Sequence, residues 1–236
     1  MLDQLKQVDN RRLYQQIADQ IRTLIHSGNF VAGTRLPPER ELAQQLGVSR
    51  PSVREALIAL EVEGSVEVRM GAGVYVCALA DRPLNATRAM GESPLELMQA
   101  RSVLEGSLIM QVCALMTPDI AMSLRRTVDD MRAAIAQNQP PLAQDRKFHL
   151  GIAAATGNSV LERLVGDLFD ERHSPISTQL SVHSESPATW LSALHEHEAI
   201  LHALETRDAL GAQTAMRLHL RVSQDRWVEG NQREWN

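Results

Sequence analysis

The chain of 236 residues contains only two cysteines, few aromatic residues (3%) and no long uncharged apolar run. Cys77 and Cys113 are too few and too far apart for the disulfide framework of a small secreted domain, so we expect a reducing, cytoplasmic location. No apolar stretch reaches the roughly 18 residues that a spanning helix needs, which argues against a membrane protein. Residues 1–12 carry five charged side chains and no apolar core, so we expect no signal peptide there.

Charge is distributed unevenly along the chain, whose net charge is −5. Residues 1–77 contain nine basic and nine acidic side chains, which leaves 15 basic and 20 acidic side chains in the remainder. Seven of the eight histidines lie at or after residue 149. A nucleic-acid surface would therefore be a local patch in the first third. Metal or proton chemistry, if present, would lie in the last third.

The first third has the pattern of a small helical module that ends in a hairpin. Apolar residues recur at helical spacing over residues 13–25 and again over 39–46. A tight Gly-Val turn follows, and Ser49 is a good N-cap for a third helix over about 50–63. Alternating valines around a glycine-rich turn then predict a β-hairpin over 66–76. Two short helices joined by a tight turn and followed by a hairpin form a winged helix-turn-helix.

Several basic and small residues in this module could contact DNA. The N-terminal residues of the second helix of the pair would face the bases, where arginine reads guanine with two hydrogen bonds. Arginines that flank the first helix could hold the DNA backbone, and small residues would let the wing tip approach the minor groove. The candidates are Arg35, Arg40, Arg50, Pro51, Ser52, Arg54 and Gly71. The competing interpretation is that these arginines pair with glutamates on a solvated surface: Glu39, Glu41 and Glu55.

Four side chains in the last third form a possible metal site. Asp145 and His149 stand four residues apart, which places them on one face of a helix. His197 and His219 lie on either side of a predicted helix break, so they can converge from neighbouring helices. Three imidazoles and one carboxylate suit Zn²⁺, Ni²⁺ or Mn²⁺ better than Ca²⁺. His195 is the alternative to His197, since both cannot face one ion, and histidines scattered over the core and surface are the alternative to any site.

Two parts of the chain resemble known families. Leu36-Pro-Pro-Glu-Arg-Glu-Leu-Ala43 and Leu46-Gly-Val-Ser-Arg-Pro-Ser-Val-Arg-Glu-Ala-Leu57 resemble the DNA-binding domain of GntR-type bacterial regulators. The Asp-x-x-x-His pair, a His before Glu-Ala-Ile and a His in a Met-x-x-His-Leu pattern are similar to the FCD domain of the FadR subfamily. The resemblance implies that Arg40, Arg50 and Arg54 contact DNA and that Gly71 lies at the wing in the minor groove. It also implies a buried metal, whose ligands would be Asp145, His149, His197 and His219.

The expected fold class is therefore mainly α. Residues 1–77 would form the winged helix-turn-helix DNA-binding domain, and the aperiodic residues 78–92 would form a linker. The resemblance implies that residues 93–236 form an all-α bundle of six or seven helices that binds metal and effector. The helical runs expected there after the first long helix begin near residue 117, and continue over about 142–155, 158–171, 188–205 and 208–228.

The resemblance also implies an effector pocket beside the metal. It places Arg101 in that pocket, where an arginine next to a metal suits a carboxylate ligand. The alternative is that Arg101 and Glu105 form a surface pair at spacing i,i+4. Asn158 is a second candidate for the pocket, although an N-cap role is an equal alternative. Two strings, Ser93-Pro-Leu-Glu-Leu-Met-Gln-Ala-Arg101 and Glu67-Val-Arg-Met-Gly-Ala-Gly-Val-Tyr-Val76, look like hexuronate-responsive regulators, which suggests a sugar acid such as galacturonate, glucuronate or fructuronate.

These inferences predict a regulator rather than an enzyme. We expect a homodimeric repressor that binds double-stranded operator DNA, because one winged helix reads few base pairs and pairing multiplies its affinity. A small carboxylate would release it, and each chain would hold one divalent transition metal, zinc before nickel or manganese. The rival class is a metal-dependent hydrolase with an appended DNA module, since an open site could activate water. No HExxH-type motif accompanies the ligands, however. A third alternative is a metal with a purely structural role.

Overall fold

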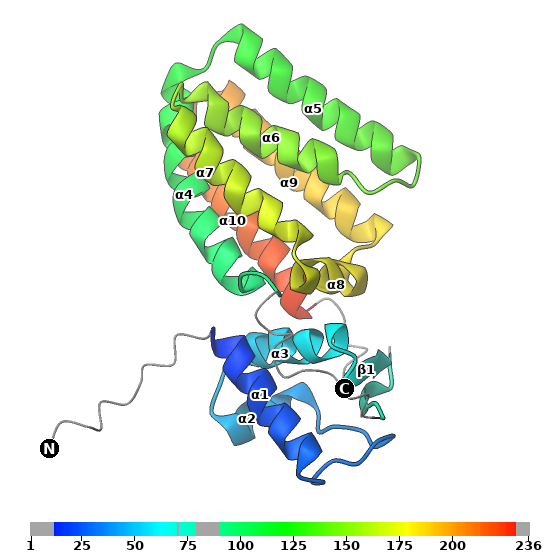
Figure 1. Cartoon of the computed structure of the whole chain (residues 1–236). Coiled ribbons are helices and arrows are strands. Elements are labelled where there is room, and N and C mark those ends of the chain that lie inside the picture. The colour runs from blue at the N-terminus through cyan, green and yellow to red at the C-terminus, as the bar shows by residue number, and fades with distance from the viewer. Residues whose placement is uncertain (1–11, 70, 79–89, 230–236) are drawn as a thin grey trace, which may run out of the picture. The chain divides into compact units, whose positions relative to one another are not determined.

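A computed structural model of the chain describes residues 12–69, 71–78 and 90–229 (Figure 1). The chain divides between Ser93 and Pro94 into two compact units. Helices dominate both, which confirms the mainly α fold class. Most of the predicted linker, residues 79–89, lies outside the described residues. No helix in the described ranges has an apolar stretch long enough to cross a membrane.

The first unit contains the predicted helix-turn-helix and hairpin. Its elements are α1 (Leu13–His26), α2 (Glu39–Leu46), α3 (Arg50–Val62), β1 (Val66–Arg69) and β2 (Gly73–Val76). The tight turn between α2 and α3 depends on Gly47, whose φ of 67° is in the left-handed region where glycine is least strained. Ser49 then caps α3 by accepting a hydrogen bond from the backbone N–H of Ser52 at 3.2 Å. Pro51 stands in the first turn of α3, where its missing N–H costs nothing. The sequence predicted these local features correctly.

The hairpin has a third extended neighbour that the sequence did not indicate. β1 and β2 pair in antiparallel register, with Val66 opposite Val76. On the other edge of β2, the Leu36 N–H donates to the Val74 carbonyl at 2.8 Å and the Val76 N–H donates to Thr34 at 2.9 Å. The segment before α2 has no alternation of apolar residues, so only its pairing with β2 reveals it.

The last residues of the predicted linker pack as part of the first unit. Met90 is buried, and the Tyr14 hydroxyl donates to the Gly91 carbonyl at 2.9 Å. The Ser93 hydroxyl donates to the Glu55 carboxylate of α3 at 2.9 Å. The chain is therefore held against α1 and α3 up to the residue that precedes the second unit.

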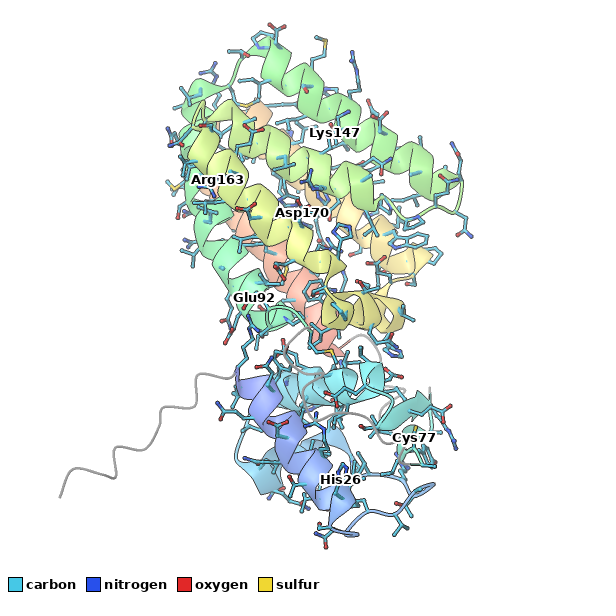
Figure 2. All side chains as sticks on the ribbon, viewed as in Figure 1. His26, Cys77, Glu92, Lys147, Arg163 and Asp170 are labelled. Carbon is cyan, nitrogen blue, oxygen red and sulfur yellow. The ribbon has the colours of Figure 1, made fainter. Side chains whose placement is uncertain are left out.

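Over the described residues 94–229, the second unit is a bundle of seven α-helices. They are α4 (Pro94–Leu115), α5 (Pro118–Ala136), α6 (Leu142–Ala155), α7 (Ser159–Asp170), α8 (Pro175–Ser184), α9 (Pro187–Glu205) and α10 (Ala209–Glu229), with a short 3₁₀ turn, η2 (Glu171–His173), after α7. α4 and α10 run side by side, and α9 packs on α10 (Figure 1). α5 covers α6 and α9, and α7 lies along α6. Lys147 on α6 and Arg163 on α7 are exposed and mark the outer side of the bundle (Figure 2).

The sequence predicted these helices to within two residues at most ends, but it missed α8. This helix, Pro-Ile-Ser-Thr-Gln-Leu-Ser-Val-His-Ser, is rich in serine and β-branched residues, which have low helix propensity. Ile176 and Leu180 are nevertheless buried. Packing of these two side chains, rather than intrinsic propensity, stabilises α8.

Tyr14 and Tyr75 give a matched test of the contact between α1 and residues 90–93. We expect Tyr14→Phe to lower the free energy of local opening by about 1 kcal/mol, because the Gly91 carbonyl loses its buried donor. Amide hydrogen exchange in residues 12–26 and 90–93 of the full chain measures this effect. Tyr75→Phe should leave the same amides unchanged, and equal exchange in both variants would contradict a role for the Tyr14 hydroxyl.

Candidate metal centre, effector cavity and DNA-binding surface

Four side chains from three helices converge inside the second unit. Asp145 and His149 come from α6, His197 from α9 and His219 from α10. One ligand atom from each lies within 4.8 Å of the others. The three imidazoles are at most 3% exposed. The structure thus brings together the four residues that the sequence analysis proposed.

Each imidazole is held through its Nδ1 atom by an acceptor outside the cluster. His149 Nδ1 bonds the Glu105 carboxylate of α4, and His197 Nδ1 bonds the Ala193 carbonyl at 2.7 Å. His219 Nδ1 bonds Glu196 Oε2 at 2.8 Å. Because carboxylates and carbonyls accept, each Nδ1 is the donor, and in the neutral imidazole each Nε2 then keeps a free lone pair. The partners of Nδ1 therefore fix the tautomer that a metal ligand needs.

The atoms that face one another in the cluster have no proton to share. Asp145 Oδ1, His149 Nε2 and His197 Nε2 are buried without a hydrogen-bond partner among the described residues. His197 Nε2 lies 2.9 Å from Asp145 Oδ1, and His149 Nε2 lies 3.4 Å from it. Burying unpaired acceptors is costly unless a cation compensates them. The donor set, three nitrogens and one carboxylate, fits a divalent transition ion.

Arg172 orients the carboxylate of the cluster. Its Nη1 donates to Asp145 Oδ2 at 2.8 Å, which leaves Oδ1 to face the imidazoles. The guanidinium lies 5.2 Å from the Phe169 ring centroid. The end of α7 is in turn tied to α6, because Arg146 Nε donates to Asp170 Oδ1 at 2.7 Å (Asp170 is labelled in Figure 2). Arg172 is thus a positioning residue that sequence reasoning missed, since it follows a helix end with no motif around it.

The pKa shifts in the cluster follow from burial and charge. Burial, together with nearby His197, lowers the pKa of His219 well below its usual range, which keeps this imidazole neutral and able to bind a metal. Burial alone would raise the pKa of Glu105. The Arg101 guanidinium and His149 outweigh burial and lower that pKa to about 2. Glu105 is therefore ionised and remains an acceptor for His149.

The structure also separates His197 from the other histidines of the last third. His195 is exposed, whereas His197 is buried in the cluster. Two residues on a helix differ by about 200°, so the two rings point to different sides of α9. Among the described residues, the His/Asp group that could hold a metal contains His197 and not His195.

A cavity adjoins the cluster. Its volume, measured as the space open to the centres of water molecules, is about 70 Å³. Asp145, His197 and His219 line one part of it, and Arg101 also lines it. Arg101 does pair with Glu105, with Nε 2.7 Å from Oε1. The pair is buried rather than on the surface, and Arg101 Nη2 has no hydrogen-bond partner in the described chain.

Asn158 does not line this cavity, so the structure gives no support to its predicted effector role. It is exposed and does not line the cavity. Its side-chain oxygen accepts from the backbone N–H groups of Val160 and Leu161 at 3.0 and 3.3 Å. These are the bonds of an N-cap, the alternative that the sequence left open.

The candidate DNA-binding residues fall into two groups. Arg35, Arg40 and Gly71 are exposed, and Pro51 is half-buried. The Arg50 side chain is 38% exposed and lies 3.7 Å from Glu39. These positions remain available to DNA.

Arg54 and Ser52 are less available to DNA than predicted, because their side chains already bond to other groups of the protein. Arg54 is 3% exposed, and its Nε and Nη2 contact the two Glu39 oxygens at 2.7 and 3.2 Å. The Ser52 hydroxyl lies 2.8 Å from that of Ser49 and is part of the helix cap. Arg54 thus pairs with a glutamate, as in the competing interpretation, but the pair is buried and not on a solvated surface. Contact of Arg54 with DNA would require this pair to open.

Comparison with known families matches both units. Residues 13–76 match the family described as bacterial regulatory proteins, gntR family, and residues 96–222 match the FCD domain. The chain is 37% identical over 227 residues to the Uxu operon transcriptional regulator of Escherichia coli K12, covering 93% of this chain and 88% of that protein. It is 36% identical over 217 residues to the Exu regulon transcriptional regulator of the same organism, covering 89% and 82%.

A solved structure shares the fold. The Escherichia coli protein McbR/YncC aligns with a TM-score of 0.51 and 20% identity, over 93% of this chain and 99% of that one. At this identity the likeness supports the fold alone.

Alanine variants of Arg54 and Arg50 should distinguish an effect on stability from an effect on DNA binding. We expect Arg54→Ala to lower the free energy of unfolding of the first unit by about 3 kcal/mol, because it leaves Glu39 buried without its main partner. Arg50→Ala should change stability by less than about 0.5 kcal/mol and weaken binding to operator DNA by about 1–3 kcal/mol. Urea denaturation and gel-shift titration measure the two effects. Unchanged operator affinity of Arg50→Ala would remove Arg50 from the interface.

His197 and His195 give a matched test of the cluster. We expect His197→Ala to lose bound metal and melt at a lower temperature, because one of four ligands is gone and a cavity replaces the ring. His195→Ala should keep both the metal content and the melting temperature of the parent chain. Elemental analysis and calorimetry of the purified proteins check this. Full metal content in His197→Ala would assign the metal to other ligands.

Proposed function

Because the chain belongs to the GntR family of bacterial regulatory proteins and carries an FCD domain, we propose that it represses a carbon-source operon until a small carboxylate binds in the second unit. The chain is a ligand-responsive transcriptional regulator and not an enzyme. The hydrolase alternative gains no support from the comparisons. What we propose beyond the family is which residues bind DNA, metal and effector, which metal and effector they bind, and that the chain is a repressor.

The proposed DNA contacts are assigned to exposed residues of the first unit. Arg50, at the start of α3, would contact base edges in the major groove, and Arg35 and Arg40 would contact phosphates. Gly71 would bring the wing close to the minor groove. Because one such unit covers only a few base pairs, the operator-bound form would be a homodimer on a palindromic site.

The proposed metal site is supported by the atoms of the cluster that have no hydrogen-bond partner among the described residues. Asp145, His149, His197 and His219 would hold one divalent ion, zinc most suitably, with nickel and manganese as alternatives. When bound, the ion would supply a positive charge at the wall of the cavity. The chain's own part is to orient the imidazoles, which Glu105, Glu196 and the Ala193 carbonyl do through the Nδ1 atoms.

One observation carries the effector arm: Arg101 Nη2, a buried cationic donor without a hydrogen-bond partner in the described chain, lines the same cavity as the metal cluster. A carboxylate would accept from this N–H and stay close to the cluster. The relatives named for the Uxu operon and the Exu regulon support a hexuronate as the effector class.

Arg101→Lys tests the effector arm with little change in charge. Lysine keeps a cation beside Glu105 but cannot donate in two directions from a planar fork. We expect the variant to bind operator DNA as the parent does, and to need at least about ten times more hexuronate for release. Gel-shift titrations with galacturonate, glucuronate and fructuronate measure both quantities, and the exposed Arg163→Lys is the control.

Release of Arg101→Lys at the parent's effector concentration would contradict the assignment of Arg101. Treatment with a chelator separates an effector-binding metal from a purely structural one. If the chelated protein still folds, binds operator and responds to hexuronate with unchanged affinity, the metal is not part of the effector site.

A further inference from the structure

The cavity beside the metal cluster has a second polar part, formed where α8 ends and α9 begins. We propose that Glu185 and Trp190 form a hydroxyl-recognising subsite, which selects a polyhydroxylated monocarboxylate over a plain or doubly charged acid. This proposal rests on the proposed effector role of the cavity. It adds the residues that read the part of the ligand beyond its carboxylate.

Most polar side chains of the cavity wall are already committed to the protein. The Ser184 hydroxyl donates to the Leu180 carbonyl at 3.0 Å, and the Thr189 hydroxyl donates to the Ser186 carbonyl at 2.9 Å. Arg226 is paired with Glu196. These groups give the wall its polarity, but they have little hydrogen-bonding capacity left for a ligand.

Two polar atoms on the same wall are different. Glu185 Oε1 and Trp190 Nε1 are buried and have no hydrogen-bond partner among the described residues. Both residues line the cavity. Glu185 Oε1 is near Arg172, but the distance of 3.6 Å is an ion-pair distance and not a hydrogen bond. A buried group without a partner is destabilising unless a ligand or water completes it.

The hydrogen-bonding properties of the two atoms define which ligand groups can pair with them. An ionised glutamate only accepts and an indole N–H only donates, whereas a hydroxyl does both. Hydroxyl groups therefore satisfy Glu185 and Trp190 alike. A second carboxylate would satisfy Trp190 but would be repelled by Glu185, and an alkyl chain would satisfy neither.

The local fold holds this subsite at a suitable place along α9. The Ser186 capping box fixes the first turn of the helix, which contains Trp190. Trp190 and His197 are seven residues apart on α9, so they lie on one face and about 10 Å apart along the axis. Trp190, His197 and His219 all line the same cavity, so a ligand held at the cluster can extend toward Trp190.

The test compares a hydroxylated acid with a plain one on full-length, metal-loaded protein. Calorimetric titration would use the best-bound of galacturonate, glucuronate and fructuronate, and propionate as the acid without hydroxyls. We expect Trp190→Phe, which keeps the ring and removes the N–H, to weaken hexuronate binding about ten-fold. Glu185→Gln should weaken it about ten-fold or more, because hydrogen bonds to charged groups are stronger. Propionate binding should change by less than about two-fold in both variants.

Controls keep the outcomes distinct. The exposed Glu162→Gln should match the parent with both ligands, and metal content should equal the parent's in Glu185→Gln, where Arg172 could shift. Equal loss for hexuronate and propionate, or no loss for either, would overturn the subsite. So would a parent protein that binds hexuronate no better than propionate, although the carboxylate site would stand. A parent that binds no carboxylate would refute the proposed function as well.

Discussion

Three buried imidazoles, each tied at Nδ1 to an acceptor, are the constraint on which the second unit depends. The acceptors and the ligands together involve α4, α6, α9 and α10. The Nδ1 bonds leave Nε2 lone pairs and one carboxylate oxygen facing one another in the buried interior. Such an arrangement is unfavourable by itself and favourable around a cation. The helices that build the bundle are therefore also the helices that define the candidate metal centre.

The same network links the candidate metal centre to the proposed effector cavity. Glu105 accepts from both His149 and Arg101, so one carboxylate holds a candidate metal ligand and the proposed effector-binding guanidinium. On another side of the cluster, Arg172 contacts Asp145 and lies near Glu185. A ligand that engages Arg101 or Glu185 acts on groups that orient the ligands of the metal. Binding of metal and of effector should consequently be coupled.

Two arginines of α3 in the first unit have different surroundings. Arg54 is used inside the protein, where a two-point contact with Glu39 joins α3 to α2. Arg50 stands one turn earlier on α3, closer to its N-terminus, and is partly exposed. Glu39 thus contacts both arginines and positions the start of α3. Arginines that look equivalent in the sequence have different surroundings, because Arg54 is buried against α2 whereas Arg50 is partly exposed.

The sequence by itself determined the local structure, and together with the family resemblance it pointed to the four side chains of the candidate metal cluster. Helix periodicity, the Ser49 cap and the glycine turns are local signals, and the Asp145–His149 spacing is set by the helical repeat. It could not decide between His195 and His197, or between a surface and a buried Arg101–Glu105 pair, because burial depends on which helices pack together. It also had no signal for α8, Arg172, Glu185 or Trp190. These residues acquire their surroundings only when segments distant in the chain meet, and an unpaired buried atom exists only once the interior around it is closed.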